Sequence, residues 1–95
     1  MTDLNDEAAA REIATNELTG ALEALLLMAE EPLSTTTLAE AVQQPVADVD
    51  HALRDIQGFY DRTRRGFELR QIAGGWRYFT RAQHAELIGR WLVEG

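Results

Sequence analysis

The chain contains few residues whose types and spacing could support catalysis or metal binding. It has two histidines and no cysteine, so a thiolate nucleophile, a thiolate metal site and a disulfide are all excluded. Asp48, His51 and Asp55 follow the i, i+3, i+7 spacing of one helix face, and such a set of side chains could bind a metal ion. The same spacing is typical of a solvated helix surface, which is the interpretation we adopt. We therefore predict no enzyme activity, no metal, no cofactor and no small-molecule ligand.

Charge is distributed unevenly along the sequence. The net charge is −7, and all nine basic residues are arginine. Residues 1–50 carry eleven carboxylates and one arginine, a net −10, whereas residues 51–95 carry five carboxylates and eight arginines, a net +3. The absence of lysine has a simple explanation in a GC-rich genome. Because a guanidinium pairs with carboxylates and stacks on aromatic rings, these arginines are suited to an acidic surface, in a partner or in the chain's own first half.

The sequence carries no segment typical of membrane insertion or secretion. No apolar run reaches the ~18 residues that suggest a transmembrane helix. Residues 1–15 are acidic and alanine-rich, without the basic start and apolar middle of a signal peptide. We expect a cytoplasmic protein that does not contact a membrane.

The amino-terminal region is predicted to precede the folded part of the chain. Residues 1–15 have the composition of a flexible acidic tail, although Glu7–Ala14 could be helical when continuous with the first predicted helix. Apolar residues at helical spacing begin at about Glu17, with Asn16 or Thr15 available as the cap.

The period of the apolar residues then changes from helical to alternating and back. Pro32 and Pro45 separate three helices, and Ser34 is placed to cap the second. Gly74-Gly75 supplies a tight turn between two strands. The predicted elements are helices over about 17–30, 35–42, 46–62 and 81–93, and strands over about 67–72 and 76–80.

This order of elements predicts an α+β, mainly α, fold of the winged helix-turn-helix class. The second and third helices, separated by the break at Gln43-Gln44-Pro45, form the helix-turn-helix. The strand pair forms a two-stranded wing, and a C-terminal helix comes last. We expect one winged-helix domain over residues 16–95.

The predicted wing presents apolar side chains on both faces. Alternation around a Gly74-Gly75 turn separates the face of Trp76 from the face of Ile72, Arg77 and Phe79. The wing can cover one face against the helices, which leaves the other for a partner, unless Trp76 folds back onto the domain. Leu27 and Met28 lie outside the main apolar face of the first helix. Unless the last helix covers them, they are also available to a partner. The candidate homodimer and partner interface is Leu27, Met28, Ile72, Trp76, Arg77 and Phe79.

A winged helix often binds DNA through its third helix and its wing. Arg64, Arg65 and Arg70 are therefore candidate contacts to DNA or to an acidic partner. The third helix, however, carries four aspartates and two arginines, and carboxylates repel the phosphates that dominate affinity for DNA. We do not expect direct DNA binding by this domain, and we keep a DNA-binding transcriptional regulator as the alternative to a protein-interaction module.

Several segments together resemble the N-terminal domain of the segregation and condensation protein B family. Ala21–Leu26 followed by Glu31–Ser34 is similar to the family's opening "IEALLF…EPLS". Arg65–Leu69 resembles its "RGIEL" strand, and Ala73–Arg77 resembles its "AGGYR" wing turn. The likeness covers about residues 17–93, and the combination of these motifs at this separation is specific.

The resemblance implies a bacterial protein with two winged-helix domains, of which the second is absent from this chain. Members of the family form homodimers, largely through the N-terminal domain. They also bind a kleisin, segregation and condensation protein A, which bridges an SMC dimer that organises chromosomes. The implied function is that of a non-enzymatic, nucleoid-associated accessory subunit in chromosome condensation and segregation.

Overall fold

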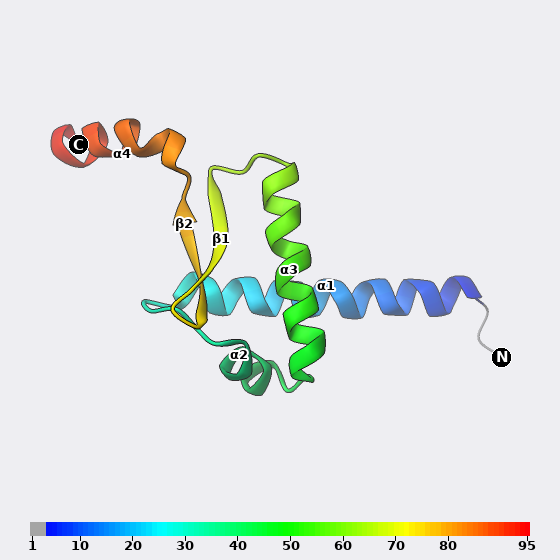
Figure 1. Cartoon of the computed structure of the whole chain (residues 1–95). Coiled ribbons are helices and arrows are strands. Elements are labelled where there is room, and N and C mark those ends of the chain that lie inside the picture. The colour runs from blue at the N-terminus through cyan, green and yellow to red at the C-terminus, as the bar shows by residue number, and fades with distance from the viewer. Residues whose placement is uncertain (1–3) are drawn as a thin grey trace.

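A computed structural model of the chain describes residues 4–95 and shows a winged helix-turn-helix with helices projecting from its two ends (Figure 1). The two projections make the molecule elongated, with dimensions of 62 × 26 × 20 Å. None of the helices described over residues 4–95 has the length and apolar character needed to cross a lipid bilayer. The elements in chain order are α1 (Leu4–Met28), α2 (Thr35–Val42), α3 (Val46–Arg62), β1 (Phe67–Ile72), β2 (Gly75–Thr80), a short 3-10 helix η1 (Ala82–His84) and α4 (Ala85–Glu94).

Helix α1 is considerably longer than the sequence pattern predicted. It begins at Leu4, not at about Glu17, so the helix that the sequence allowed over Glu7–Ala14 is continuous with the predicted one, and residues 1–3 lie outside the described residues. Thr15 does not cap the helix, because its hydroxyl donates to the carbonyl of Arg11 at 2.9 Å. The alanine-rich run has high helix propensity and no proline or glycine interrupts it. Side chains 5–17 are exposed, and this part of α1 extends past α3 (Figure 1).

Helices α2 and α3 have the predicted bounds. The Ser34 hydroxyl accepts a hydrogen bond from the backbone N–H of Thr37 at 3.0 Å, which caps α2, and Gln43 ends it in the left-handed region at φ 55°. Leu38 and Ala39 are buried on the inner face of α2, whereas Ala41 is exposed. The predicted helix-turn-helix is therefore confirmed.

The core lies where α1, α2 and α3 meet the inner face of the hairpin. Helix α3 buries one apolar face, formed by Val49, Ala52, Leu53, Ile56 and Tyr60. Each fully buried leucine or valine of the core contributes roughly 1.5–3 kcal/mol. The larger buried side chains are Leu22, Leu26, Leu38, Val49, Leu53, Ile56, Tyr60, Leu69 and Trp76.

The wing turn differs from the prediction by one residue. Ile72 pairs with Gly75, so the two turn residues are Ala73 at φ 48° and Gly74 at φ 77°, and β2 begins at Gly75. Two positive φ angles are typical of the type I′ turn that joins two-residue hairpins. Moving the turn by one residue shifts the strand pairing by two, which leaves each side chain on its predicted face.

Gly75 has a separate reason to be glycine. A Cβ atom at this position would lie 2.8 Å from Cβ and 2.9 Å from the carbonyl carbon of Pro32. The start of β2 therefore packs directly on the loop between α1 and α2, where Leu33 and Trp76 exchange backbone hydrogen bonds of 3.0 and 2.7 Å.

Candidate interaction surface

The inner face of the wing belongs to the protomer core. Trp76 is fully buried, and its indole N–H donates to the Thr35 hydroxyl at 2.9 Å. The guanidinium of Arg54 covers its ring at 5.5 Å. The assignment of Trp76 to a partner interface is therefore wrong, because the loop–strand pairing at Leu33 draws the start of β2 into the core.

The outer face of the wing is a ridge of arginine and aromatic side chains. Arg70 and Arg77 pack on the ring of Phe79, with guanidinium carbons 5.0 and 5.9 Å from its centroid. Ile72 and Phe79 are each only partly buried. We call Arg70, Ile72, Arg77 and Phe79 the wing ridge. It has the mixed cationic and aromatic character that protein interfaces favour.

The end of α1 presents two large apolar side chains to solvent. Leu27 is 76% exposed and Met28 is 79% exposed. The sequence left open whether the last helix covers them. In the structure α4 packs mainly on η1 and projects away from the body, so these two residues stay uncovered in the protomer (Figure 1).

Helix α4 carries a larger apolar surface that sequence reasoning did not assign to an interface. Trp91 is 68% exposed, and Leu87, Leu92 and Val93 are also exposed. A ten-residue helix that packs mainly on the adjacent 3-10 turn is marginal in water, so a covering surface would stabilise it. One signal for this interface was available in the sequence: the first three helices and the wing already supplied a complete core without α4.

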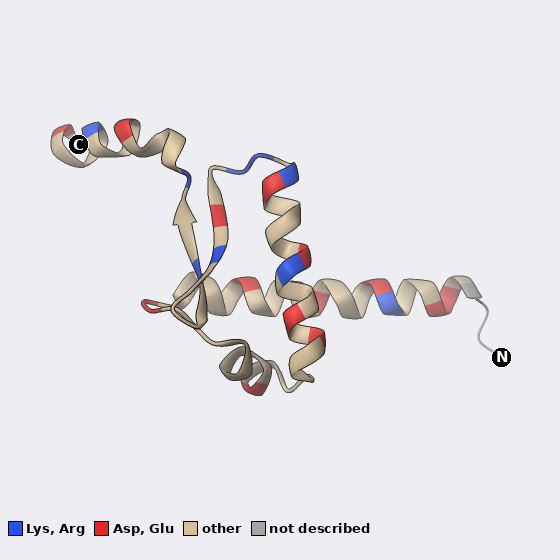
Figure 2. Ribbon diagram, viewed as in Figure 1, with Lys and Arg blue, Asp and Glu red and all other residues tan. Residues whose placement is uncertain are grey.

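The loop between α3 and β1 carries the basic residues predicted to contact DNA or an acidic partner. Arg64 adopts a left-handed conformation at φ 53° and is exposed, and Arg65 packs on the ring of Phe59 at 5.7 Å. Arg81 supports the loop, because it pairs with Asp61 at 2.9 Å and donates to the carbonyl of Arg65 at 2.6 Å. Figure 2 shows this basic loop above an α3 whose lower half is acidic. Arg70 does not join the loop and belongs to the wing ridge.

The carboxylates of α3 are on the protein surface. Asp50 pairs with Arg54 at 3.0 Å, and Asp55 pairs with His51 at 3.2 Å. His51, Asp55 and Asp48 are all exposed. Among residues 4–95, no three histidine or acidic side chains come together as metal ligands would.

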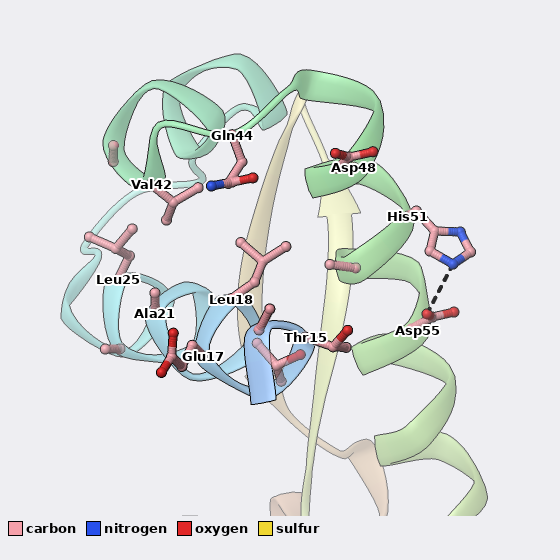
Figure 3. Close-up of a pocket in the computed structure, with 15 residues that line it drawn as sticks. Thr15, Glu17, Leu18, Ala21, Leu25, Val42, Gln44, Asp48, His51 and Asp55 are labelled. Carbon is pink, nitrogen blue, oxygen red and sulfur yellow. Dashed lines mark ion pairs between the residues drawn. The ribbon is translucent and has the colours of Figure 1, made fainter. Parts of the chain in front are cut away.

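A groove of about 880 Å³ lies between α1, α2 and the first half of α3 (Figure 3). Leu18, Ala21 and Leu25 contribute to it from α1, and Val42 contributes from α2. Asp48, His51, Ala52 and Asp55 line it from α3. The three residues first considered as metal ligands thus border an apolar groove.

A partly buried polar cluster joins α1, α3 and β2. The Tyr60 hydroxyl donates to a carboxylate oxygen of Glu23 and lies 3.0 Å from the Tyr78 hydroxyl. Removal of both hydroxyls from water raises the pKa of Tyr60 and of Tyr78, and the hydrogen bond to Glu23 raises that of Tyr60 further. The cluster keeps its polar atoms partnered and fixes the wing against the helices.

Comparison with known proteins gives consistent matches. A family model described as segregation and condensation complex subunit ScpB matches residues 20–95. Segregation and condensation protein B of Moorella thermoacetica is 37% identical over 71 residues, and that of Symbiobacterium thermophilum is 38% identical over 71 residues. Each alignment covers 75% of this chain but only 36% and 32% of the relative. The chain therefore spans about a third of the length of these curated relatives.

Solved structures show the same fold. ScpB from Mycobacterium tuberculosis matches with a TM-score of 0.82 at 36% identity, over 85% of this chain and 51% of that one. An ScpB N-terminal domain, solved as a dimer complexed with an ScpA peptide, matches with a TM-score of 0.77. Its sequence identity is 23%, over 82% of this chain and 98% of that one, so this likeness concerns the fold alone.

Proposed function

The chain belongs to the segregation and condensation protein B family, and we propose that it is a non-enzymatic accessory subunit of a bacterial SMC–kleisin complex. In this proposal the chain forms a homodimer and binds the kleisin, segregation and condensation protein A, through which it reaches SMC. It would act in chromosome condensation and segregation, at the nucleoid in the cytoplasm. The dimer of an ScpB N-terminal domain with an ScpA peptide supports this choice of partners by analogy.

The observation that carries the proposal is the amount of apolar surface that the protomer leaves uncovered. Leu27, Met28 and the apolar face of α4 are exposed, although the core beneath the wing is complete. Contiguous exposed apolar patches on a small domain mark protein interaction sites. Tryptophan and methionine are also among the residues enriched at interfaces. A second copy offers the same side chains, so a two-fold seam would cover both sets at once.

The charges of the helix-turn-helix disfavour the alternative of a DNA-binding regulator. Asp48 and Asp50 are on the N-terminal half of α3, the part of a recognition helix that contacts bases in the major groove. The basic loop at Arg64 and Arg65 is the feature that favours DNA contact, but the net charge of −7 opposes it. In a gel-shift experiment at low salt, we expect no retardation of duplex DNA. Tight binding that is lost on Arg64→Ala and Arg65→Ala substitution would support the regulator instead.

Isothermal titration of the chain with a purified fragment of the kleisin from the same bacterium tests the proposed partner. We expect saturable binding, because the domain offers uncovered apolar surface and the Arg70 and Arg77 guanidinium groups of the wing ridge for a peptide. Arg70→Glu with Arg77→Glu reverses the charge of the ridge, and Arg11→Glu with Arg62→Glu is the control with the same change in net charge. Absence of binding by the unaltered chain would remove the kleisin from the proposal.

A further inference from the structure

We propose that the groove between α1, α2 and α3 docks a cationic amphipathic helix from a different protein. The groove is bordered by exposed side chains of three helices and is open along α1 (Figure 3). Neither Leu27 nor Met28 lines it, so it is separate from the surface assigned above to the homodimer. The inference does not depend on the proposed function.

The floor of the groove suits a helix. Leu18, Leu25 and Val42 provide its larger apolar side chains, and each is only partly buried. Alanines line the groove between these larger side chains, and such small residues allow the backbone of a second helix to approach closely. The α1 wall from Ala14 to Leu25 is about 16 Å long at 1.5 Å per residue, or about three helical turns. The alanines that line the groove are Ala14, Ala21, Ala24, Ala41 and Ala52.

The rim of the groove selects the charge of its occupant. Glu17 borders it on α1, and Asp48 and Asp55 border it on α3. Among the lining residues that the structure describes there is no arginine to neutralise them, and the imidazole of His51 lies 3.2 Å from a carboxylate oxygen of Asp55. An apolar floor with a carboxylate rim complements a helix whose apolar stripe is flanked by arginine or lysine.

A second copy of this chain lacks such a helix. The projecting part of α1, residues 4–15, carries three carboxylates and one arginine, and α4 carries two carboxylates and one arginine. Either helix would place further negative charge against the rim. The cationic surfaces described above are the wing ridge, which is a β-hairpin whose Arg70 and Arg77 are packed on Phe79, and the loop at Arg64 and Arg65, and neither is a helix. Charge and shape together therefore assign the groove to a different protein.

Amide chemical-shift mapping of the full chain with model peptides tests the proposal. The probe is a three-turn helical peptide with a leucine and alanine stripe flanked by arginines, and the control is a scrambled peptide of the same composition. We expect shifts concentrated at the groove residues, weakening with salt, and at least tenfold weaker binding of the scrambled peptide. Shifts spread over the acidic surface, or equal binding of the two peptides, would overturn the proposal.

Matched substitutions locate the binding. Ala21→Trp fills the floor and should weaken binding at least tenfold, whereas Ala47→Trp, at an exposed position that does not line the groove, should not. Asp48→Asn with Asp55→Asn should weaken binding about three- to tenfold, at the magnitude of two exposed ion pairs. Glu40→Gln with Glu68→Gln makes the same change in net charge outside the groove and should have little effect.

Two further outcomes are decisive. If both charge-neutralised variants lose affinity equally, the peptide senses only the net charge and the groove is not its site. If the groove amides shift with the concentration of the chain alone, a second copy occupies the groove and the assignment to a different protein is wrong. All substituted positions are exposed or partly exposed, so a dispersed amide spectrum is the check that each variant is folded.

Discussion

Substitution of the two tryptophans distinguishes the protomer core from the interaction surface, because one ring is buried and the other is exposed. Trp76 is 0% exposed and donates its indole N–H to Thr35, whereas Trp91 is 68% exposed on α4. Trp76→Ala removes a fully buried ring, which costs about 3–5 kcal/mol of the free energy of unfolding. About 1 kcal/mol of that cost is the hydrogen bond to Thr35. A domain of this size has a stability on the order of 5–10 kcal/mol, so the variant should be near the limit of folding.

Trp91→Ala should leave the protomer nearly unchanged. The ring has little cover to lose within the protomer, and alanine has the higher helix propensity, so the expected change is within about 0.5 kcal/mol. Urea unfolding followed by far-ultraviolet circular dichroism measures both variants. The protein concentration must be low, because association would add to the apparent stability. Trp76→Phe keeps most of the ring and should fall between the two, at about 1–2 kcal/mol.

Either of two results would refute this reasoning. A loss above about 1 kcal/mol for Trp91→Ala at low concentration would mean that α4 packs on its own protomer, contrary to its exposure in the structure. A loss below that value for Trp76→Ala would mean that β2 is not held in the core by its pairing with Leu33.

Individual contacts support three more predictions. Gly75→Ala should cost about 1–3 kcal/mol in urea unfolding, because the added carbon would lie 2.8 Å from Pro32 Cβ; a neutral effect would contradict this packing. Because the pKa of Tyr60 is raised in the folded protein, the unfolded chain loses the phenol proton first, at about pH 10. The contribution of Tyr60 to the free energy of unfolding is therefore complete below that pH and declines above it. Tyr60→Phe should therefore lower the thermal midpoint at neutral pH and flatten its alkaline decline, and an unchanged decline would exclude Tyr60 as its source. Ser34→Ala should cost about 1 kcal/mol by removing the cap of α2, and an unaltered midpoint would refute that role.

The elements with local signals could be predicted from the sequence. Ser34 and Pro45 mark the starts of α2 and α3, and both helices have the predicted bounds because a cap and a proline act on adjacent residues. Strand alternation placed the wing side chains on their faces even though the turn was misplaced. The family resemblance was confirmed by the match over residues 20–95.

The features that were missed depend on distant contacts or on competing local preferences. The start of α1 was misplaced because Asn16 and Thr15 are good caps, yet the alanine-rich run before them continues the helix. Gly74-Gly75 contains two candidate turn residues, and only the contact of Gly75 with Pro32, which is far away in sequence, decides between the possible turns. The backbone pairing of Trp76 with Leu33 then buries the Trp76 side chain. Sequence periodicity alone could not show that α4 would stay uncovered.

The mass of the chain in solution, measured by light scattering over a range of concentrations, tests the central claim most directly. The claim is that the apolar side chains left uncovered by the protomer mediate its association. We predict a dimer for the chain and for Ile13→Glu, which adds a charge at a comparably exposed apolar position of α1. We predict a monomer for Leu27→Glu with Met28→Glu. A monomer for the unaltered chain at every concentration, or the same dimer for all three proteins, would contradict the account.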